Sequence, residues 1–272
     1  GLRAELEALR GAPGGFHAVP YSVAYADRLV RAHALLLAAA DAVAADDAEF
    51  AGYLRNRGRD LLTDDYEAGD AAWVTGEFKN LNAQIGSYET YDDELHGAKT
   101  FFSLSLLARR PADSEALRAT LGALQAFEDA LPYADKKRVR DRIPVGVYDV
   151  IADFGQARGG NTATILPNEA YLARRYGRTI LLRANIMRDP TLFAGTDTAW
   201  RSVIAPAHAD DLTADATFHR TLWHEVGHYL GVDATADGRP LDDALGDTTD
   251  LLEEMKADLV SLFSARALRA RG

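Results

Sequence analysis

The chain has 272 residues, with 41 acidic against 30 basic side chains and a formal net charge of −11. Because binding to phosphates requires a basic surface, this balance argues against nucleic acid as the main partner. The chain contains no cysteine, which excludes disulfides, thiolate metal ligands and a cysteine nucleophile. Any metal ion must therefore be held by His, Asp and Glu.

The first half of the chain has helical patterning. Ser22 is a suitable N-cap for a long helix that reaches Ala45, and the Asp46-Asp47 pair predicts a break before a second helix over Phe50–Leu62. The run Ala32–Ala45 contains His33 and Asp41, so it is typical of a core helix and not of a membrane span. No other segment is long and apolar enough to cross a membrane, and we expect no membrane partner.

Shorter segments follow. A strand is predicted over Asn82–Tyr88, and a further helix over Leu104–Leu131 with an interruption at Pro111. The pattern changes at Ile143, where β-branched residues alternate as in a strand. Two similar strands are predicted over Ala163–Leu166 and Thr179–Leu182.

The last segments are again helical, over Leu212–Gly231 and Thr249–Leu268, with a polar loop over Val232–Asp247. We therefore expect an α+β fold that is mostly α. Its predicted parts are a helical region over residues 1–142, a small central β-element over residues 143–211 and a helical pair over residues 212–272, packed as one compact unit.

The clearest chemical signal is the motif His224-Glu225-Val226-Gly227-His228. Two histidines four residues apart lie on one face of a helix, so that both imidazoles can bind one Zn²⁺. The intervening Glu225 then lies beside the remaining coordination position, where it can take a proton from a metal-activated water. The alternative is a pair of surface or capping histidines.

A helical wheel separates this motif from the apolar face of its own helix. Phe218, Leu222, Val226, Tyr229 and Leu230 form one apolar arc, and the two histidines lie on the opposite side. The histidines are therefore expected to face a cleft or solvent.

A zinc site needs a third protein ligand, and the last helix offers carboxylates. Its apolar stripe of Leu251, Met255, Leu259 and Leu262 is expected to be buried. Glu254 flanks that stripe and is expected to lie half-buried against the histidine helix, whereas Glu253 points nearly the opposite way. Asp258, one turn on, is placed to accept a hydrogen bond from a ligating histidine. Alone, the Glu-Glu pair is more typical of a solvated helix face.

Together, His224–His228 and the segment Glu253-Glu254-Met255-Lys256-Ala257-Asp258 resemble the zinc and glutamate motifs of the dipeptidyl peptidase III family. Further segments are similar to that family in the same order along the chain, including bacterial relatives. They cover residues 16–22, 62–66, 85–97, 165–169 and 177–182.

The resemblance implies a zincin-like helical zinc-binding domain with one zinc ion. His224, His228 and Glu254 would be the zinc ligands, and Glu225 the general base. Tyr91 would stabilise the developing oxyanion, and Glu89 and Asn168 would hold the free α-amine of a peptide. Taken alone, Tyr91 and Glu89 would be a turn tyrosine and a surface glutamate.

The resemblance predicts a zinc-dependent hydrolase that cleaves short peptides, in a cytoplasmic bacterial protein without a signal segment. Its expected substrate is a small peptide or other small molecule with a free amine. Two alternatives stay open: a zinc enzyme acting on a non-peptide metabolite, and a non-catalytic zinc-binding or peptide-binding relative. They are kept because chains of this family continue well beyond the glutamate helix.

Overall fold

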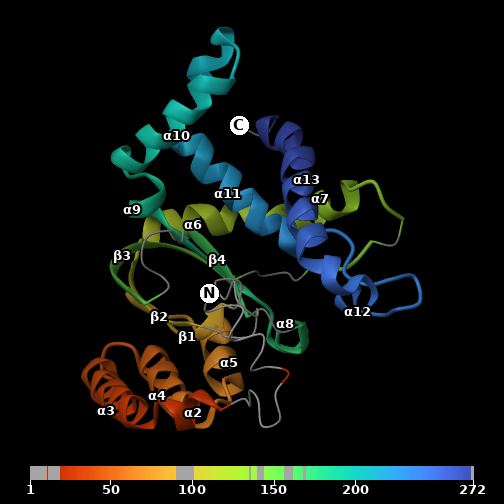
Figure 1. The fold of residues 1–272 in the computed structure, drawn as a ribbon. Helices are drawn as coiled ribbons and strands as arrows, with labels where there is room; N and C mark the ends of the chain where they lie inside the picture. Colours follow the sequence, from red (N-terminus) through yellow and green to blue (C-terminus); the bar gives the residue numbers. More distant parts are fainter. Residues whose placement is uncertain are drawn as a thin grey trace. The chain divides into compact units, whose positions relative to one another are not determined.

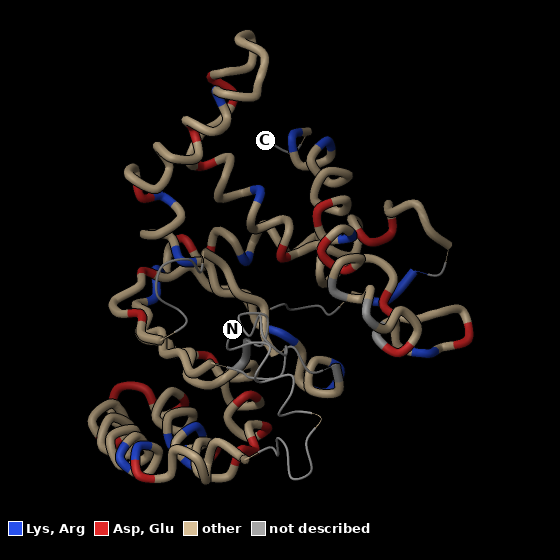
Figure 2. The backbone as a smooth tube through the Cα atoms, viewed as in Figure 1, with Lys and Arg blue, Asp and Glu red and all other residues tan. Residues whose placement is uncertain are grey.

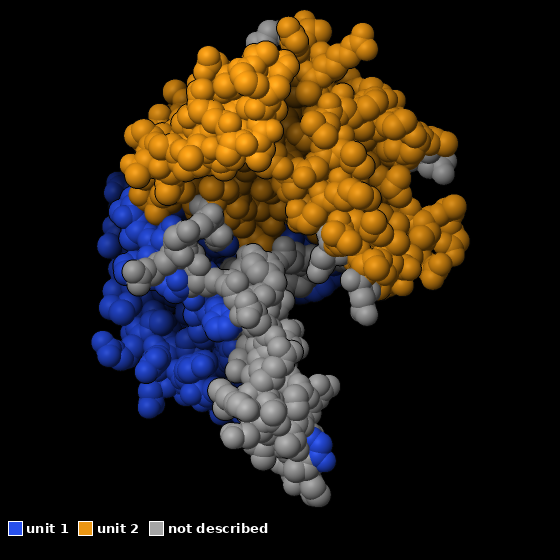
Figure 3. All heavy atoms as spheres, turned by 45° about the horizontal axis from the view of Figure 1, so that its top comes forward, with its two compact units in different colours: residues 1–107, 151–159, 167–176 blue, residues 108–150, 160–166, 177–272 orange. Residues whose placement is uncertain are grey.

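The computed structural model describes residue 11 and residues 19–89, 101–134, 136–139, 144–155, 162–167 and 170–270. The described residues are mostly helical and include a small sheet, which confirms the predicted α+β class (Figure 1). The zincin-like assignment stays a prediction. The chain divides into two compact units (Figure 3): unit 1 comprises residues 1–107, 151–159 and 167–176, and unit 2 comprises residues 108–150, 160–166 and 177–272.

Unit 1 contains a group of helices and two strands. Its elements are α2 (Tyr21–Ala24), α3 (Ala26–Val43), α4 (Ala48–Thr63), α5 (Glu67–Thr75), β1 (Leu81–Glu89), β2 (Phe101–Arg109) and α8 (Ala170–Tyr176). The predicted restart at Asp46-Asp47 is confirmed, because the Asp47 carboxylate caps α4 by accepting the Phe50 N–H at 3.0 Å. Helix α4 then buries an apolar face that includes Phe50, Leu54 and Leu61.

Two predictions for unit 1 are wrong. Ser22 does not begin the long helix but lies inside the short helix α2, where its hydroxyl donates to Asp64 at 2.6 Å. Asp64, with φ at 57°, is the C-cap of α4, so this contact joins two helices. Residues 104–109 are not helical: they belong to β2, and helix begins only at Pro111, where proline is favoured in the first turn.

Unit 2 carries most of the remaining helices. Its elements are α6 (Pro111–Thr120), η1 (Leu121–Ala123), α7 (Leu124–Ala130), β4 (Ala163–Leu166), β5 (Thr179–Arg183), α9 (Ala184–Met187), α10 (Pro190–Val203), η2 (Pro206–Asp211), α11 (Ala214–Tyr229), α12 (Leu241–Leu245), η3 (Gly246–Thr248) and α13 (Thr249–Arg269). Strand β3 (Val145–Gly155) begins in this unit. Apolar residues of α6, α7, β5 and α11 form one buried core.

The strands are ordered β1-β2-β3-β5-β4. Strand β3 pairs with β5 in parallel, with Val145 opposite Ile180, and β4 pairs with β5 in antiparallel, with Ala163 opposite Leu182. Every residue of β5 is buried, as expected for a strand inside a sheet. The strands predicted over 143–151, 163–166 and 179–182 are therefore present, while helix α10 within residues 143–211 was not predicted. The domain boundaries at 142 and 211 stay a prediction.

The last helix packs with a different face from the predicted one. Leu251, Met255, Leu259 and Leu262 are 72%, 51%, 57% and 71% exposed, whereas Ala257 and Val260 are buried. Helix α13 carries acidic residues in its first half and basic residues at its end, the distribution that its dipole favours (Figure 2). Among the described residues, none of the helices has the length and apolar character that crossing a membrane requires.

Candidate metal centre

Helix α11 carries the two histidines, and the local sequence explains why it forms. The Thr213 hydroxyl caps its first turn by accepting the Ala216 N–H at 3.0 Å. The predicted apolar arc is confirmed, since Phe218, Leu222, Val226 and Leu230 are at most 4% exposed. Burial of this face fixes the rotation of the helix, so that His224 and His228 lie on the side that faces α13.

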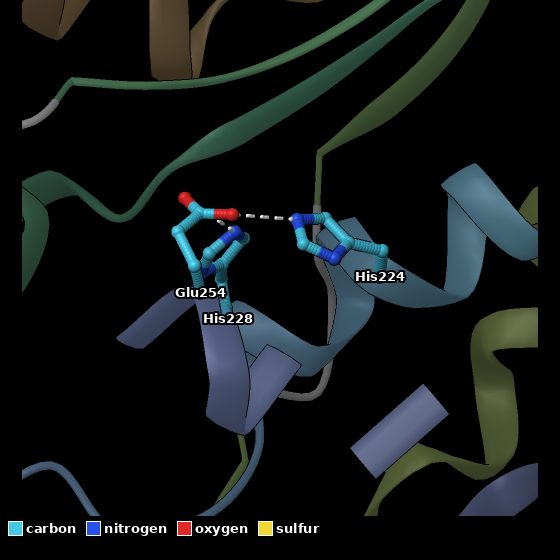
Figure 4. Close-up of side chains that lie close together, drawn as sticks. All are labelled: His224, His228 and Glu254. Atoms are coloured by element: carbon cyan, nitrogen blue, oxygen red, sulfur yellow. Dashed lines mark ion pairs between the residues drawn. The ribbon is translucent and has the colours of Figure 1, made fainter. Parts of the chain in front are cut away.

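Both histidines converge on one carboxylate of α13 (Figure 4). Nε2 of His224 lies 3.1 Å from Glu254 Oε2, and Nε2 of His228 lies 3.8 Å from Glu254 Oε1. The ligand atoms of the three residues all lie within 4.8 Å of one another. The Glu254 side chain is 63% exposed, so the expected half-buried position is wrong, because the helix turns its apolar stripe outwards.

The opposite nitrogen of each ring contacts a second carboxylate. Nδ1 of His224 lies 2.9 Å from Asp258 Oδ1, as predicted, and Nδ1 of His228 lies 3.0 Å from Glu253 Oε1. In the tautomer that carries its proton on Nδ1, each ring donates a hydrogen bond to this second carboxylate, which can only accept. The Nε2 lone pair of that tautomer faces Glu254 and can bind a metal ion, which is the arrangement that ligating histidines adopt in proteins.

Glu253 is a residue that the sequence analysis placed incorrectly. It was expected to point away from the site, but its side chain is only 31% exposed and also binds the Lys256 ammonium group at 2.8 Å. Burial alone would raise the pKa of Glu253, but the contacts with His228 and Lys256 outweigh it and lower the pKa to about 2. The side chain is therefore ionised and able to accept a hydrogen bond from His228.

Glu225 lies on α11 between the histidines and is 9% exposed. Burial raises the pKa of this carboxyl group, the two histidines oppose the rise, and Glu254 adds to it. A carboxylate with a raised pKa is a stronger proton acceptor than one in water.

The two helices meet at a contact between small residues. A Cβ atom added to Gly227 would lie 2.5 Å from the carbonyl oxygen of Ala257 and 2.7 Å from its Cα. Glycine at this point in the motif therefore allows the backbones to approach closely, which brings the carboxylates of α13 within reach of the histidines.

The donor types fit zinc, because two imidazole nitrogens and one carboxylate oxygen are ordinary zinc ligands. A tetrahedral ion with bonds of about 2.0–2.1 Å separates its ligand atoms by about 3.4 Å. The separations of 3.1 Å to Glu254 Oε2 and 3.8 Å to Glu254 Oε1 lie near that value, and one ligand atom of each residue lies within 4.8 Å of the other two.

The two predicted substrate-binding residues, Glu89 and Asn168, and the predicted catalytic Tyr91 cannot be placed at this site. Tyr91 and Asn168 lie outside the described residues, and Glu89 is described only as the last backbone position of β1. Their roles stay predictions.

Comparisons with known proteins now give this geometry a context. No protein-family model matches the chain. The structure of DPP III from Caldithrix abyssi matches 96% of the chain and 51% of its own length, with a TM-score of 0.81 and 27% sequence identity. The dipeptidyl-peptidase III structure from Corallococcus sp. strain EGB matches 99% of the chain and 55% of its own length, with a TM-score of 0.80 and 27% identity.

A curated relative, Nudix hydrolase 3 from Arabidopsis thaliana, is 26% identical over 263 residues, which cover 94% of the chain and 34% of the plant protein. The chain shares the architecture of solved dipeptidyl peptidase III structures, and two of its helices carry a His-His-Glu cluster. It is a relative of dipeptidyl peptidase III. The chain spans about half the length of those two solved structures.

Proposed function

We propose that this chain carries the zinc centre of a peptidase that hydrolyses short peptides with a free amino terminus. The single observation that carries the proposal is the convergence of His224, His228 and Glu254, with both Nδ1 atoms held by further carboxylates. The dipeptidyl peptidase III neighbours support the peptidase class.

In this proposal His224 Nε2, His228 Nε2 and a Glu254 carboxylate oxygen would hold one zinc ion. When bound, zinc supplies Lewis-acid chemistry: it polarises a carbonyl group and lowers the pKa of water. A carboxylate oxygen of Glu225 accepts the proton of the attacking water, and burial, which raises the pKa of this group, makes it a stronger base than a solvated carboxylate. The same group then gives the proton to the departing amine.

The proposal further assigns substrate binding to Glu89 and Asn168 and a catalytic role to Tyr91. A carboxylate at Glu89 and an amide at Asn168 would bind the ammonium group of the substrate, and the Tyr91 hydroxyl would donate to the oxygen on which charge develops. The net charge of −11 favours a substrate that carries a free amine over a polyanion.

The test combines metal analysis with hydrolysis of a panel of dipeptidyl and tripeptidyl amides, with and without a chelator. We expect one zinc per chain, chelator-sensitive turnover and loss of zinc in His224→Ala. Glu225→Gln should keep its zinc while the rate falls at least about 100-fold. Full metal occupancy in His224→Ala would refute the ligand assignment.

N-acetylated versions of the same amides are the matched control for the substrate class. We expect acetylation to abolish turnover, because it removes the charge that Glu89 and Asn168 would bind. Equal turnover of free and acetylated substrates would refute this part of the proposal. Zinc-dependent turnover of non-peptide compounds alone would refute the peptidase assignment.

A further inference from the structure

Nδ1 of each histidine contacts a carboxylate of α13, and each of these carboxylates also contacts a cationic side chain. On the His224 side, Asp258 Oδ1 binds both the histidine and Nη2 of Arg220, at 2.9 Å and 3.1 Å. On the His228 side, Glu253 Oε1 binds both the histidine and Nζ of Lys256, at 3.0 Å and 2.8 Å. We call these two chains of contacts the Arg220 arm (Arg220, Asp258 and His224) and the Lys256 arm (Lys256, Glu253 and His228). They have the same chemistry but different surroundings.

The Arg220 arm faces solvent, and the Lys256 arm is largely enclosed. Arg220 and Asp258 are 68% and 48% exposed at their side chains, whereas Lys256 and Glu253 are 21% and 31% exposed. Solvent screens an ion pair of the first kind, so it contributes little to holding a geometry. Removing one partner from an enclosed pair leaves the other charge without compensation, which destabilises the folded protein strongly. The enclosed pair therefore holds its geometry.

The surroundings of Lys256 explain why its ammonium group stays in place. Lys256 and Glu253 line an apolar groove of about 520 Å³ in unit 2, together with side chains such as Leu131, Tyr133 and Leu241. The aliphatic stem of Lys256 lies over Gly231, where an added Cβ would be 3.3 Å from Lys256 Cδ. Gly231 has φ at 83° and lies just beyond the end of α11, so the stem is braced by the turn that follows the histidine helix.

We infer that Lys256 is a positioning residue for His228: its ammonium group holds Glu253 against Nδ1 of His228 and thereby directs Nε2 of that histidine toward Glu254. Arg220 has no comparable effect on His224, because its pair with Asp258 is exposed. The inference rests on the proposed function in taking the three converging residues as a zinc site. Lys256 is not one of the proposed zinc ligands, and its effect on the site passes through Glu253.

The test compares two variants. Lys256→Met keeps the aliphatic stem and removes the charge, and Arg220→Met removes the cation that contacts His224 through one carboxylate in the same way. Zinc dissociation constants are measured by competition with a chromophoric chelator. We expect about tenfold weaker zinc binding in Lys256→Met and a change within about twofold in Arg220→Met. Lys256→Arg restores a cation and should recover most of the affinity.

A second readout uses the metal-free proteins. Long-range ¹H–¹⁵N spectra of the histidine side chains report which ring nitrogen carries the proton. We expect the Nδ1–H form of His228 in the natural sequence and in Lys256→Arg, and a mixture of both forms in Lys256→Met. Lys256→Gln serves as the second uncharged variant if thermal unfolding shows that Lys256→Met does not fold.

Two results would overturn the inference: natural zinc affinity with an unchanged His228 spectrum in the folded uncharged variants, or an equal loss of affinity in Arg220→Met. The second result would mean that any nearby cation matters, and not the enclosed pair. If the natural protein binds no zinc, the proposed function fails, while the spectra of the metal-free proteins still decide the role of Lys256.

Discussion

Asp60 of α4 is fully buried in unit 1 beside a second buried carboxylate and one arginine. Arg57 pairs with Asp60 at 3.5 Å and also binds Asp70, and its guanidinium lies 4.8 Å from the ring centre of Tyr66. Burial raises the pKa of Asp60 to about 6; Arg57 opposes the rise and Asp70 adds to it. This cluster therefore makes the stability of the fold depend on pH. It lies in unit 1, whereas His224, His228 and Glu254 lie in unit 2.

We predict that Asp60→Asn removes one cause of the decrease in the free energy of unfolding as the pH rises. Because the folded-state pKa is raised from 3.8 to about 6, the folded chain binds the proton more tightly than the unfolded chain. This contribution is complete below about pH 4 and is lost as the pH rises through 6. Over that window the natural chain should lose up to about 3 kcal/mol relative to Asp60→Asn.

Urea unfolding of both proteins at intervals between pH 4 and 7.5 measures the difference directly. Carboxylates that do not interact with Asp60 titrate alike in both proteins and cancel in the comparison. A difference that stays flat or rises with pH would contradict the assignment.

At the residue scale, the sequence located the groups whose spacing is set within one helix. His224, Glu225 and His228 needed only the helical repeat. The hydrogen bond between Asp258 and His224 is predictable because Asp258 lies one turn from Glu254. Glu253 and Lys256 were missed because their contacts depend on which face of α13 packs inwards, a property of the tertiary structure that helix periodicity alone cannot decide.

At the scale of elements, the crossing of α11 and α13 brings the site together, and Gly227 controls it. We predict that Gly227→Ala lowers the free energy of unfolding by about 1–3 kcal/mol, because the added methyl group overlaps the backbone of Ala257. The helices must move apart, so zinc binding should weaken by at least about tenfold.

Gly195→Ala on α10 is the matched control, since a Cβ there meets nothing within 4 Å. We expect this change to be neutral or to stabilise the protein by up to about 1 kcal/mol. Denaturant unfolding and chelator competition measure both variants. Unchanged stability and zinc affinity in Gly227→Ala would show that the close approach is not required.

The apolar stripe of α13 gives a second prediction at this scale. Because Leu262 is 71% exposed and Val260 is 7% exposed, Leu262→Gln should change the free energy of unfolding by less than about 0.5 kcal/mol, while Val260→Ala should cost about 2 kcal/mol. Equilibrium unfolding in denaturant tests the pair. A large cost for Leu262→Gln would mean that the stripe is buried in solution.

The same stripe shows why an apolar helix face need not be buried. Helical periodicity indicates that Leu251, Met255, Leu259 and Leu262 share a face, and that is correct. The step from a shared apolar face to a buried one failed, because α11 is contacted through Ala257 instead. Strand β2 was misassigned for a related reason: the leucine-rich segment over residues 104–109 suits either state, and only its neighbours in the sheet decide.

At the scale of the whole molecule, the His224-His228-Glu254 cluster belongs entirely to unit 2, as do α11 and α13. Unit 1 has its own buried residues around α4, including Phe50 and Leu61. A ligand that binds only folded unit 2 stabilises that unit by mass action. The effect on unit 1 depends on how strongly the two units are coupled, which zinc itself can measure.

We predict that zinc slows amide exchange in α11 and α13 and leaves α4 nearly unchanged. With free zinc at 100 times its dissociation constant, the stabilisation is about 2.7 kcal/mol, which slows exchange through unfolding of unit 2 by about 100-fold. Hydrogen exchange followed by mass spectrometry, with zinc or with chelator, resolves peptides from residues 218–230, 253–264 and 50–61. His224→Ala is the control that should show no zinc effect. Equal protection of all three peptides would mean that the units unfold as one, and no protection of any would mean that zinc does not bind.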